Sequence, residues 1–181
     1  MKKIEIVYRD ERNEAAIQKL NQIVEEIFHG YAEIEVCYAN QLTSLSRIHA
    51  DAYLVIDRSL LPSLRNHTDE LKNVVMMERS ISKSKLKEML EIPKNTRVLV
   101  VNDTQANAEE MTYMLYELGI GHLQLIPYSS GHVDNYEGIH YAITPDEVPS
   151  VPKHIENIIN TGYRMVSFDA ISKIAEGLEL E

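Results

Sequence analysis

Short apolar runs typical of β-strands alternate with helix-periodic segments from one end of the chain to the other. The runs at 3–8, 52–56 and 97–102 are rich in valine, isoleucine and leucine, and a polar segment able to start a helix follows each of them. Nearly continuous apolar runs are typical of strands buried on both faces of a sheet. The alternation therefore predicts an α/β fold with mostly parallel sheets and helices on both faces.

The helical segments carry their apolar residues three and four positions apart. After the first strand, Ile17, Leu20 and Val24 form one such stripe, and Gly30 follows as a residue suited to end a helix. We also expect a short helix over 43–49. Each of these segments is long enough to cover part of a sheet.

The same rules apply to the last part of the chain. Ile155, Ile158 and Ile159 have helical spacing and predict a helix that ends near Gly162. Residues 163–166 then predict the last strand, which a final helix would follow.

A weak internal repeat divides the chain near Pro93. Three strand-like runs in the first part resemble runs in the second part at offsets of roughly 90 residues. The pairs are 4–7 with 98–101, 51–55 with 139–143, and 74–77 with 163–166. We therefore expect two similar flavodoxin-like or receiver-like lobes, residues 1–92 and 93–181, in a periplasmic-binding-protein-like or chelatase-like arrangement with a ligand site between them.

The charge balance excludes some classes of function. Lys and Arg number 18 against 28 Asp and Glu, a net charge of −10, which disfavours direct contact with nucleic acid. No apolar stretch approaches the roughly 20 residues of a membrane span. The single cysteine, Cys37, cannot form an internal disulfide and is interpreted as a small strand residue. We expect a cytoplasmic protein.

Motifs that bind cofactors or carry catalysis are absent from the sequence. It contains no G-x-G-x-x-G fingerprint, no phosphate-binding loop with lysine, no G-x-S-x-G elbow and no Cys/His spacing of a zinc site. We therefore expect no catalytic residue, metal or cofactor, and no enzyme activity. A small α/β enzyme with an unrecognised site stays as one alternative.

Polar residues near the carboxyl ends of the predicted strands are the candidate ligand-binding residues, because ligands of open α/β sheets bind there. The candidates are Arg58, Ser59, Arg79, Asn102, Tyr128 and Thr144. The two arginines follow buried strands, and a guanidinium can hold a carboxylate or phosphate with two parallel hydrogen bonds. The alternative for each arginine is an ion pair with its neighbour, Asp57 or Glu78.

A receiver-like phosphoacceptor is a second alternative. Asp10 and Glu11 after the first strand and Asp57 after the third resemble the acidic, magnesium-binding pocket of a receiver domain. The first half lacks a fifth strand ending in the lysine that would pair with the phosphoryl group. The second half has Thr144 where an acceptor would stand.

Several stretches resemble one known family. They include IPKNTRVLVVN (92–102), GIGHLQLIPY (119–128), YAITP (141–145), VP (151–152) and IINTGYR (158–164). They resemble the N-terminal sensory region of sigma-54-dependent transcriptional activators of Gram-positive bacteria, which is related to the propionate-catabolism-activator type of sensor domain. The resemblance covers the second half well and the first half by pattern only.

The resemblance implies a two-lobe signal-input region of a bacterial transcriptional regulator. A small polar effector, or a regulatory protein domain, would bind between the lobes and bias an attached activator. A second copy of the chain is a further candidate partner. No P-loop is present, so we expect either an excised sensor domain or a stand-alone relative of it.

Overall fold

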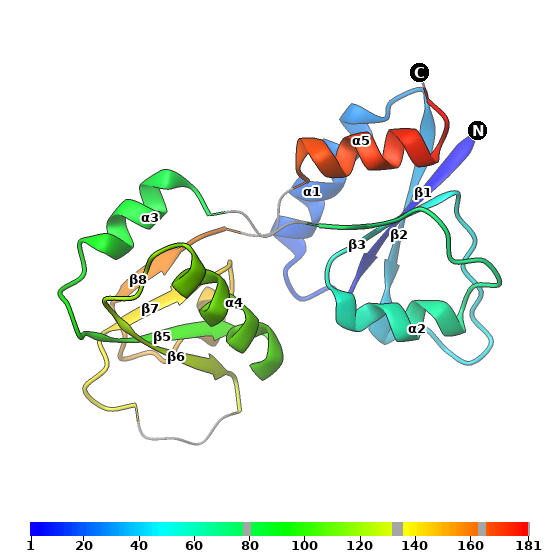
Figure 1. The fold of residues 1–181 in the computed structure, drawn as a ribbon. Helices are drawn as coiled ribbons and strands as arrows, with labels where there is room; N and C mark the ends of the chain where they lie inside the picture. The colour runs from blue at the N-terminus through cyan, green and yellow to red at the C-terminus, as the bar shows by residue number, and fades with distance from the viewer. Residues whose placement is uncertain (78–80, 132–135, 163–165, 181) are drawn as a thin grey trace. The chain divides into compact units, whose positions relative to one another are not determined.

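The structure is a computed structural model that describes residues 1–77, 81–131, 136–162 and 166–180. It forms two compact units (Figure 1). Unit 1 comprises Met1–Ser80 and Arg164–Glu181, and unit 2 comprises Ile81–Tyr163.

Unit 1 is built on a four-stranded parallel sheet with the strand order β2-β1-β3-β4. Its strands are β1 (Lys2–Tyr8), β2 (Ala32–Tyr38), β3 (Ala52–Val55) and β4 (Val74–Met76). The two central strands are the predicted apolar runs, and every residue of β3 is buried. The register places Val7 of β1 opposite Val55 of β3, so the carboxyl ends of these strands meet at one edge.

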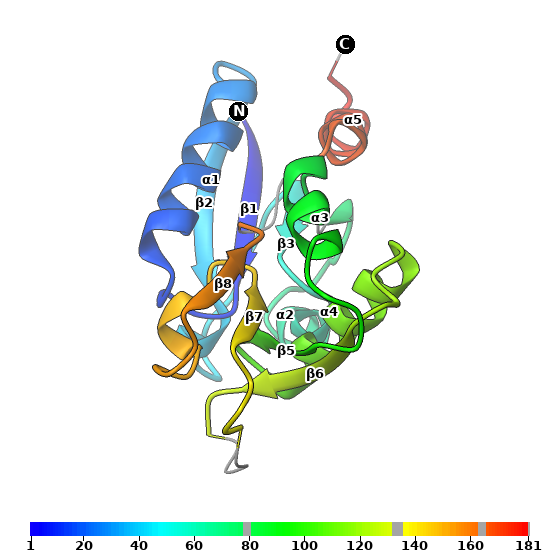
Figure 2. The same ribbon diagram turned by 90° about the vertical axis from the view of Figure 1, so that its left-hand side faces the viewer.

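Helices cover both faces of this sheet. The helices of unit 1 are α1 (Glu14–Ile27), α2 (Leu61–Asn66), α5 (Phe168–Gly177) and two short 3₁₀ helices, η1 (Ala39–Gln41) and η2 (Arg58–Leu60). Figures 1 and 2 show α1 and α5 on one side of the sheet and α2 on the other. The α1 stripe is buried at Ile17, Leu20 and Val24, as its spacing predicts.

Unit 2 repeats this architecture with the strand order β6-β5-β7-β8, again all parallel. Its strands are β5 (Arg97–Asn102), β6 (Gln124–Ser129), β7 (Tyr141–Thr144) and β8 (Asn157–Asn160), and its helices are α3 (Lys83–Leu90), α4 (Gln105–Glu117) and η3 (Val148–Ser150). The predicted α/β fold of two similar lobes is thereby confirmed.

Two cores lie on opposite faces of the unit 2 sheet. One contains Met89 of α3 and Met111 and Leu115 of α4, packed on Val98, Val100 and Ile143. The other contains Leu99, Val101 and Ala142 together with Val151 and Ile155, which follow η3. Thus α3 and α4 cover one face, and η3 with the residues that follow it covers the other.

The two units exchange helices. Helix α3 follows β4 of unit 1 along the chain but packs on β8 of unit 2, whereas α5 follows β8 but packs on β3 and β4 of unit 1. The first unit therefore ends near residue 80 and regains residues 164–181, which differs from the expected division at 92/93. A break in sequence pattern at Pro93 marks the end of α3 and the start of the next strand, and these elements belong to the same unit.

Two local predictions are wrong. Residues 157–160 form strand β8 instead of the expected helix, because they pair with β7 and bury Ile159 against the sheet. No helix forms over 43–49, where the chain is irregular after η1. The expected strand over 163–166 falls mostly on residues 163–165, which lie outside the described residues.

The internal repeat changes accordingly. β1 corresponds to β5 and β3 to β7, as the first two predicted pairs indicate. In the third pair, β4 corresponds to β8. β8 lies at the edge of the unit 2 sheet, as β4 lies at the edge of the unit 1 sheet.

Candidate functional site

The carboxyl edge of the unit 1 sheet joins residues that are about fifty positions apart in the sequence. Arg9 follows β1 and Asp57 follows β3, and the parallel pairing of these strands brings the two side chains together. Nη2 of Arg9 donates a hydrogen bond to Oδ2 of Asp57 at 2.9 Å and another to Oγ of Ser59 at 2.8 Å. The edge thus carries an oriented guanidinium.

Asp57 organises this edge. Its carboxylate is buried, with 6% of the residue exposed, and its Oδ1 accepts hydrogen bonds from the backbone N–H of Ser59 at 2.9 Å and from the Ser59 hydroxyl. Asp57 therefore caps the start of η2 while it holds Arg9. Both oxygens of the Asp57 carboxylate thus accept hydrogen bonds from residues of this edge.

Arg58 lies beside this network at the first position of η2 and is exposed. Its side chain makes no ion pair with any residue that the structure describes. Among the described residues Asp57 pairs with Arg9, and the expected alternative of an ion pair between Arg58 and Asp57 does not form. Arg79, the other predicted arginine, lies outside the described residues.

The loop after β1 adds an acidic residue to the same edge. Asp10 accepts hydrogen bonds from the Arg12 backbone N–H at 3.1 Å and from the Arg12 guanidinium at 2.7 Å. Burial alone would raise the pKa of Asp10, but the two hydrogen bonds and the charges of Arg12 and Arg9 outweigh it and lower this pKa below its ordinary value. Asp10 is therefore ionised at neutral pH.

At the corresponding edge of unit 2, Asn102 is buried at the end of β5. Its Oδ1 accepts a hydrogen bond from the Asp103 backbone N–H at 2.8 Å, and its Nδ2 donates to the Asn107 carbonyl at 3.4 Å. Thr104 caps α4 by accepting the Asn107 backbone N–H at 3.1 Å. The structure thus places Asn102 inside the network that starts α4.

Thr144 is fully buried at the end of β7. Its hydroxyl accepts the Glu147 backbone N–H at 3.1 Å, and its carbonyl accepts the Thr161 backbone N–H at 2.9 Å. The neighbouring pair Asp146 and Asn160 is tied by two hydrogen bonds, of 2.9 and 2.7 Å. Thr144 shapes the turn after the strand and offers no surface to a ligand.

Tyr128 lies within β6, opposite Val101 of β5. Its ring packs edge-on against Tyr136, with 5.2 Å between ring centroids, and both rings border the second core of unit 2. Of the predicted candidates that the structure describes, Arg58 and Ser59 lie together at the edge of the unit 1 sheet. Asn102, Tyr128 and Thr144 lie near the carboxyl ends of the neighbouring strands β5, β6 and β7 of unit 2. Arg9 also follows a predicted strand directly, but it is not among the predicted ligand-binding residues, because its contact with Asp57 depends on the strand order.

The described residues contain neither a cluster of metal-binding side chains nor a membrane-spanning helix. Nowhere among them do three or more His, Cys, Asp or Glu side chains gather as they would around a metal ion. No helix in the described part of the chain has the length and apolar character needed to cross a membrane.

Comparisons with known proteins give no match to this chain among family models, curated proteins or solved structures. The edge of the unit 1 sheet, and the resemblance noted in the sequence, are therefore the basis for a functional proposal.

Proposed function

We propose that this chain is a signal-sensing regulatory domain that binds a small anionic metabolite at the carboxyl edge of the unit 1 sheet. The observation that carries the proposal is the position of exposed Arg58 beside the Arg9–Asp57–Ser59 network. This is the edge at which open α/β sheets bind their ligands.

The chemistry of the edge favours an anion. Arg58 is exposed and forms no ion pair with a described residue, while Arg9 and Arg12, also near this edge, are held by Asp57 and Asp10. A guanidinium matches the planar geometry of a carboxylate and also binds phosphate oxygens. The buried carboxylate of Asp57 fixes Arg9, which lowers the entropy lost when a ligand is bound.

A regulatory role fits these residues better than catalysis does. Asp57, Asn102 and Thr144 are buried and use their polar atoms in local hydrogen bonds. General acid–base or nucleophilic catalysis needs such a group within reach of a substrate. The resemblance to the sensory region of sigma-54-dependent activators supports the same role, in a regulator of transcription.

A thermal-shift screen tests the proposal. Mono-, di- and tricarboxylates and phosphorylated metabolites are added to the purified protein. A ligand present at 100 times its Kd should stabilise the folded state by about 2.7 kcal/mol. A ligand found in this way should lose at least about tenfold in affinity, measured by calorimetry, when Arg58 is replaced by alanine.

Arg65→Ala supplies the matched control, because Arg65 is an exposed arginine on α2. It should leave the affinity unchanged. Absence of any anionic ligand from a broad library, or a ligand whose affinity Arg58→Ala leaves intact, would contradict the proposed site.

A further inference from the structure

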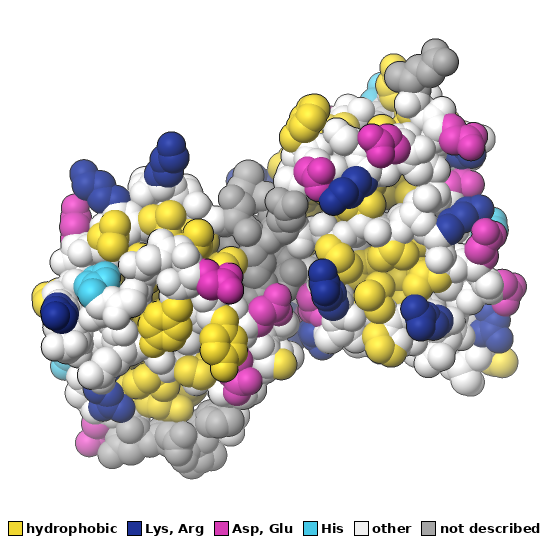
Figure 3. All heavy atoms as spheres, viewed as in Figure 1, with side chains coloured by type: hydrophobic (Ala, Val, Ile, Leu, Met, Phe, Trp, Pro, Cys, Tyr) yellow, Lys and Arg dark blue, Asp and Glu magenta, His cyan; other side chains and the backbone are white. Residues whose placement is uncertain are grey.

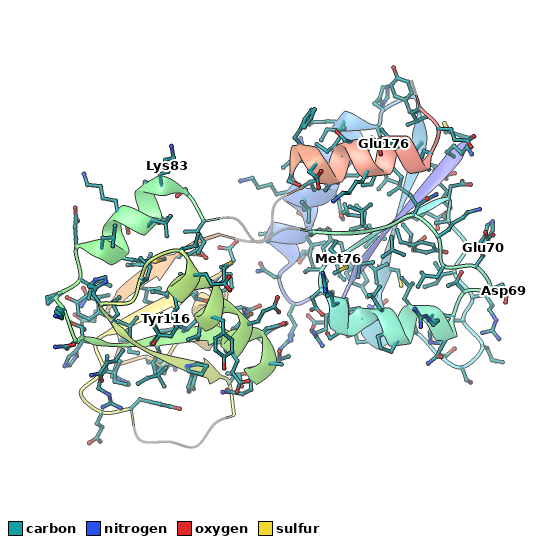
Figure 4. The ribbon with its side chains drawn as sticks, viewed as in Figure 1. Asp69, Glu70, Met76, Lys83, Tyr116 and Glu176 are labelled. Carbon is teal, nitrogen blue, oxygen red and sulfur yellow. The ribbon has the colours of Figure 1, made fainter. Side chains whose placement is uncertain are left out.

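The outer surface of helices α3 and α4 in unit 2 carries two matching rows of side chains. On α3, Lys83, Lys87 and Leu90 are exposed at positions i, i+4 and i+7, which lie on one face of a helix. The inward face of this helix packs through Met89 and Leu86 on the sheet. Figure 4 shows Lys83 pointing away from the unit at the start of α3.

The row on α4 has the opposite charge. Glu109, Tyr113 and Glu117 are exposed at positions i, i+4 and i+8, while Met111 and Leu115 face the core. Helix α4 contains no lysine or arginine. Tyr116 lies next to this row and accepts the Leu125 backbone N–H through its hydroxyl at 3.2 Å, which fixes it beside β6.

Large hydrophobic side chains are exposed on these two rows and beside them. Tyr113 is 69% exposed, Leu90 58%, Leu118 47% and Tyr116 41%. Figure 3 shows hydrophobic side chains gathered over the region of α4, with lysines projecting from α3. Exposed apolar groups of this size, bordered by charged residues, are typical of protein–protein interfaces.

We propose that this surface binds the same surface of a second copy of the chain, with α3 of each copy against α4 of the other. Both helices pack on the same core and cover the same face of the unit 2 sheet. In the proposed dimer a twofold axis sets the lysine row of each copy against the glutamate row of the other. In that position the lysines also meet the Tyr113 ring, a geometry that favours a cation–π contact. The self-complementary charge pattern is the reason for choosing a second copy over an unrelated partner.

Charge matters for the specificity of this association. The chain has a net charge of −10, so two copies repel each other at most orientations. The α3 row is a local exception, because neither Lys83 nor Lys87 forms an ion pair with a residue that the structure describes. Contact between unlike rows removes the repulsion at this one surface.

Charge-swapped variants of the full chain test the proposal. One variant carries Lys83→Glu and Lys87→Glu, and the other carries Glu109→Lys and Glu117→Lys. All four positions are exposed, and the first position of α3 and the last of α4 gain charges that suit the helix dipole. Both variants should therefore fold, which circular dichroism and thermal unfolding can verify.

Sedimentation equilibrium gives the readout. Wild-type protein should shift with concentration from the 20.7 kDa mass of one chain towards twice that mass. Each variant alone should dimerise at least about tenfold more weakly, since like rows then face each other. An equimolar mixture should restore the dimer, because both contacts in the mixed pair are again between unlike rows. Tyr113→Ala should also weaken the wild-type dimer.

A control variant with Lys2→Glu and Lys19→Glu, at exposed positions of unit 1, changes the net charge by the same amount as the Lys83→Glu and Lys87→Glu variant and should leave dimerisation unchanged. Three outcomes would overturn the proposal: a single-chain mass at all concentrations, a dimer that neither charge-swapped variant weakens, or a mixture that does not recover. A single-chain mass would leave this surface to a different protein partner.

Discussion

Asn73 ties the last helix to the sheet of unit 1 through a hydrogen bond to Gly177. Its side-chain amide donates to the Gly177 carbonyl at 2.9 Å and to the Asp51 carbonyl at 2.8 Å. The backbone of Asn73 has a φ of +48°, in the left-handed region that asparagine adopts more readily than most residues. One side chain thus joins the start of β3 to the end of α5.

Gly177→Ala should destabilise the protein by about 1–3 kcal/mol. A Cβ at this position would lie 2.7 Å from Cγ of Asn73, so the amide would have to leave its two acceptors. At an unobstructed helical position the same change would stabilise by about 0.5–1 kcal/mol. Denaturant unfolding of the variant therefore decides the sign of the effect.

Two further variants isolate the cause. Gly121→Ala should be close to neutral, because nothing lies within 4 Å of a Cβ there. In a background with Asn73→Gly, which keeps the left-handed backbone accessible, Gly177→Ala should no longer destabilise. An unchanged penalty in that background would show that Asn73 is not the obstruction.

Ile174→Ala and Met89→Ala should loosen different sheets. Both side chains are fully buried, Ile174 on α5 and Met89 on α3, and each truncation should cost about 2–4 kcal/mol. Since α5 packs on β3 and β4, hydrogen exchange should rise there in Ile174→Ala. Met89→Ala should raise exchange in the sheet of unit 2. The opposite result would contradict the assignment of α5 to unit 1 and α3 to unit 2: faster hydrogen exchange in unit 2 for Ile174→Ala and in unit 1 for Met89→Ala.

Glu5 should make the protein less stable as pH rises. Its side chain is buried in β1, and this burial raises its pKa above the ordinary value. The charge of Lys3 lowers the pKa in part, since Nζ of Lys3 lies 3.7 Å from Oε2 of Glu5, and the charge of Glu35 raises it. A raised pKa in the folded state means that folding favours the protonated form. The stability is therefore complete below the unfolded pKa and declines as pH rises through the folded pKa.

Glu5→Gln should remove this decline. Unfolding free energies measured between pH 4 and pH 8 should fall less steeply in the variant than in the wild type. Glu25→Gln, at an exposed position on α1, should keep the wild-type slope. Identical slopes for all three proteins would show that Glu5 ionises in the folded state without cost.

Cys37 should react slowly with thiol reagents in the folded protein. The residue is buried in β2, and burial, together with the nearby charge of Glu5, raises the pKa of its thiol to about 11. At pH 8 the thiolate fraction is then at least about 100 times smaller than for a free cysteine. Labelling with a chromogenic disulfide should be slower by that factor than in denaturant, and equal rates would contradict this.

Asp57→Ala should destabilise unit 1 by about 1–3 kcal/mol. The change leaves Arg9 without the carboxylate that it contacts at 2.9 Å and removes the cap of η2. Arg58→Ala should change the unfolding free energy by less than about 0.5 kcal/mol, because its side chain is exposed. If both substitutions changed the unfolding free energy equally, the assignment of a structural role to Asp57 and a ligand-facing role to Arg58 would be contradicted.

The strands that sequence predicts best are those buried on both faces. β1, β3 and β5 stand out because valine, isoleucine and leucine fill both alternating sets of positions. β8 has only two apolar residues between two asparagines, and the spacing of its isoleucines fits a helix equally well. Its identity as a strand depends on pairing with β7, which local sequence does not encode.

The candidate site was predictable to the same limited degree. Arg58 and Ser59 follow a strongly apolar strand, so their place at the sheet edge follows from the pattern. The contact between Arg9 and Asp57 depends on β1 and β3 being neighbours, which requires the strand order. Asn102 and Thr144 occupy similar positions but are buried by the turns that follow them, and a sequence shows no such burial.

The exchange of helices also sets an order for folding during synthesis. All of unit 2 comes from one continuous segment, residues 81–163, and its sheet and both covering helices can assemble once that segment has left the ribosome. Unit 1 starts earlier yet needs α5, which is made about a hundred residues after β4. The first unit to begin is therefore the last to be completed, and until then the face of β3 and β4 that α5 covers stays open to chaperones or misfolding.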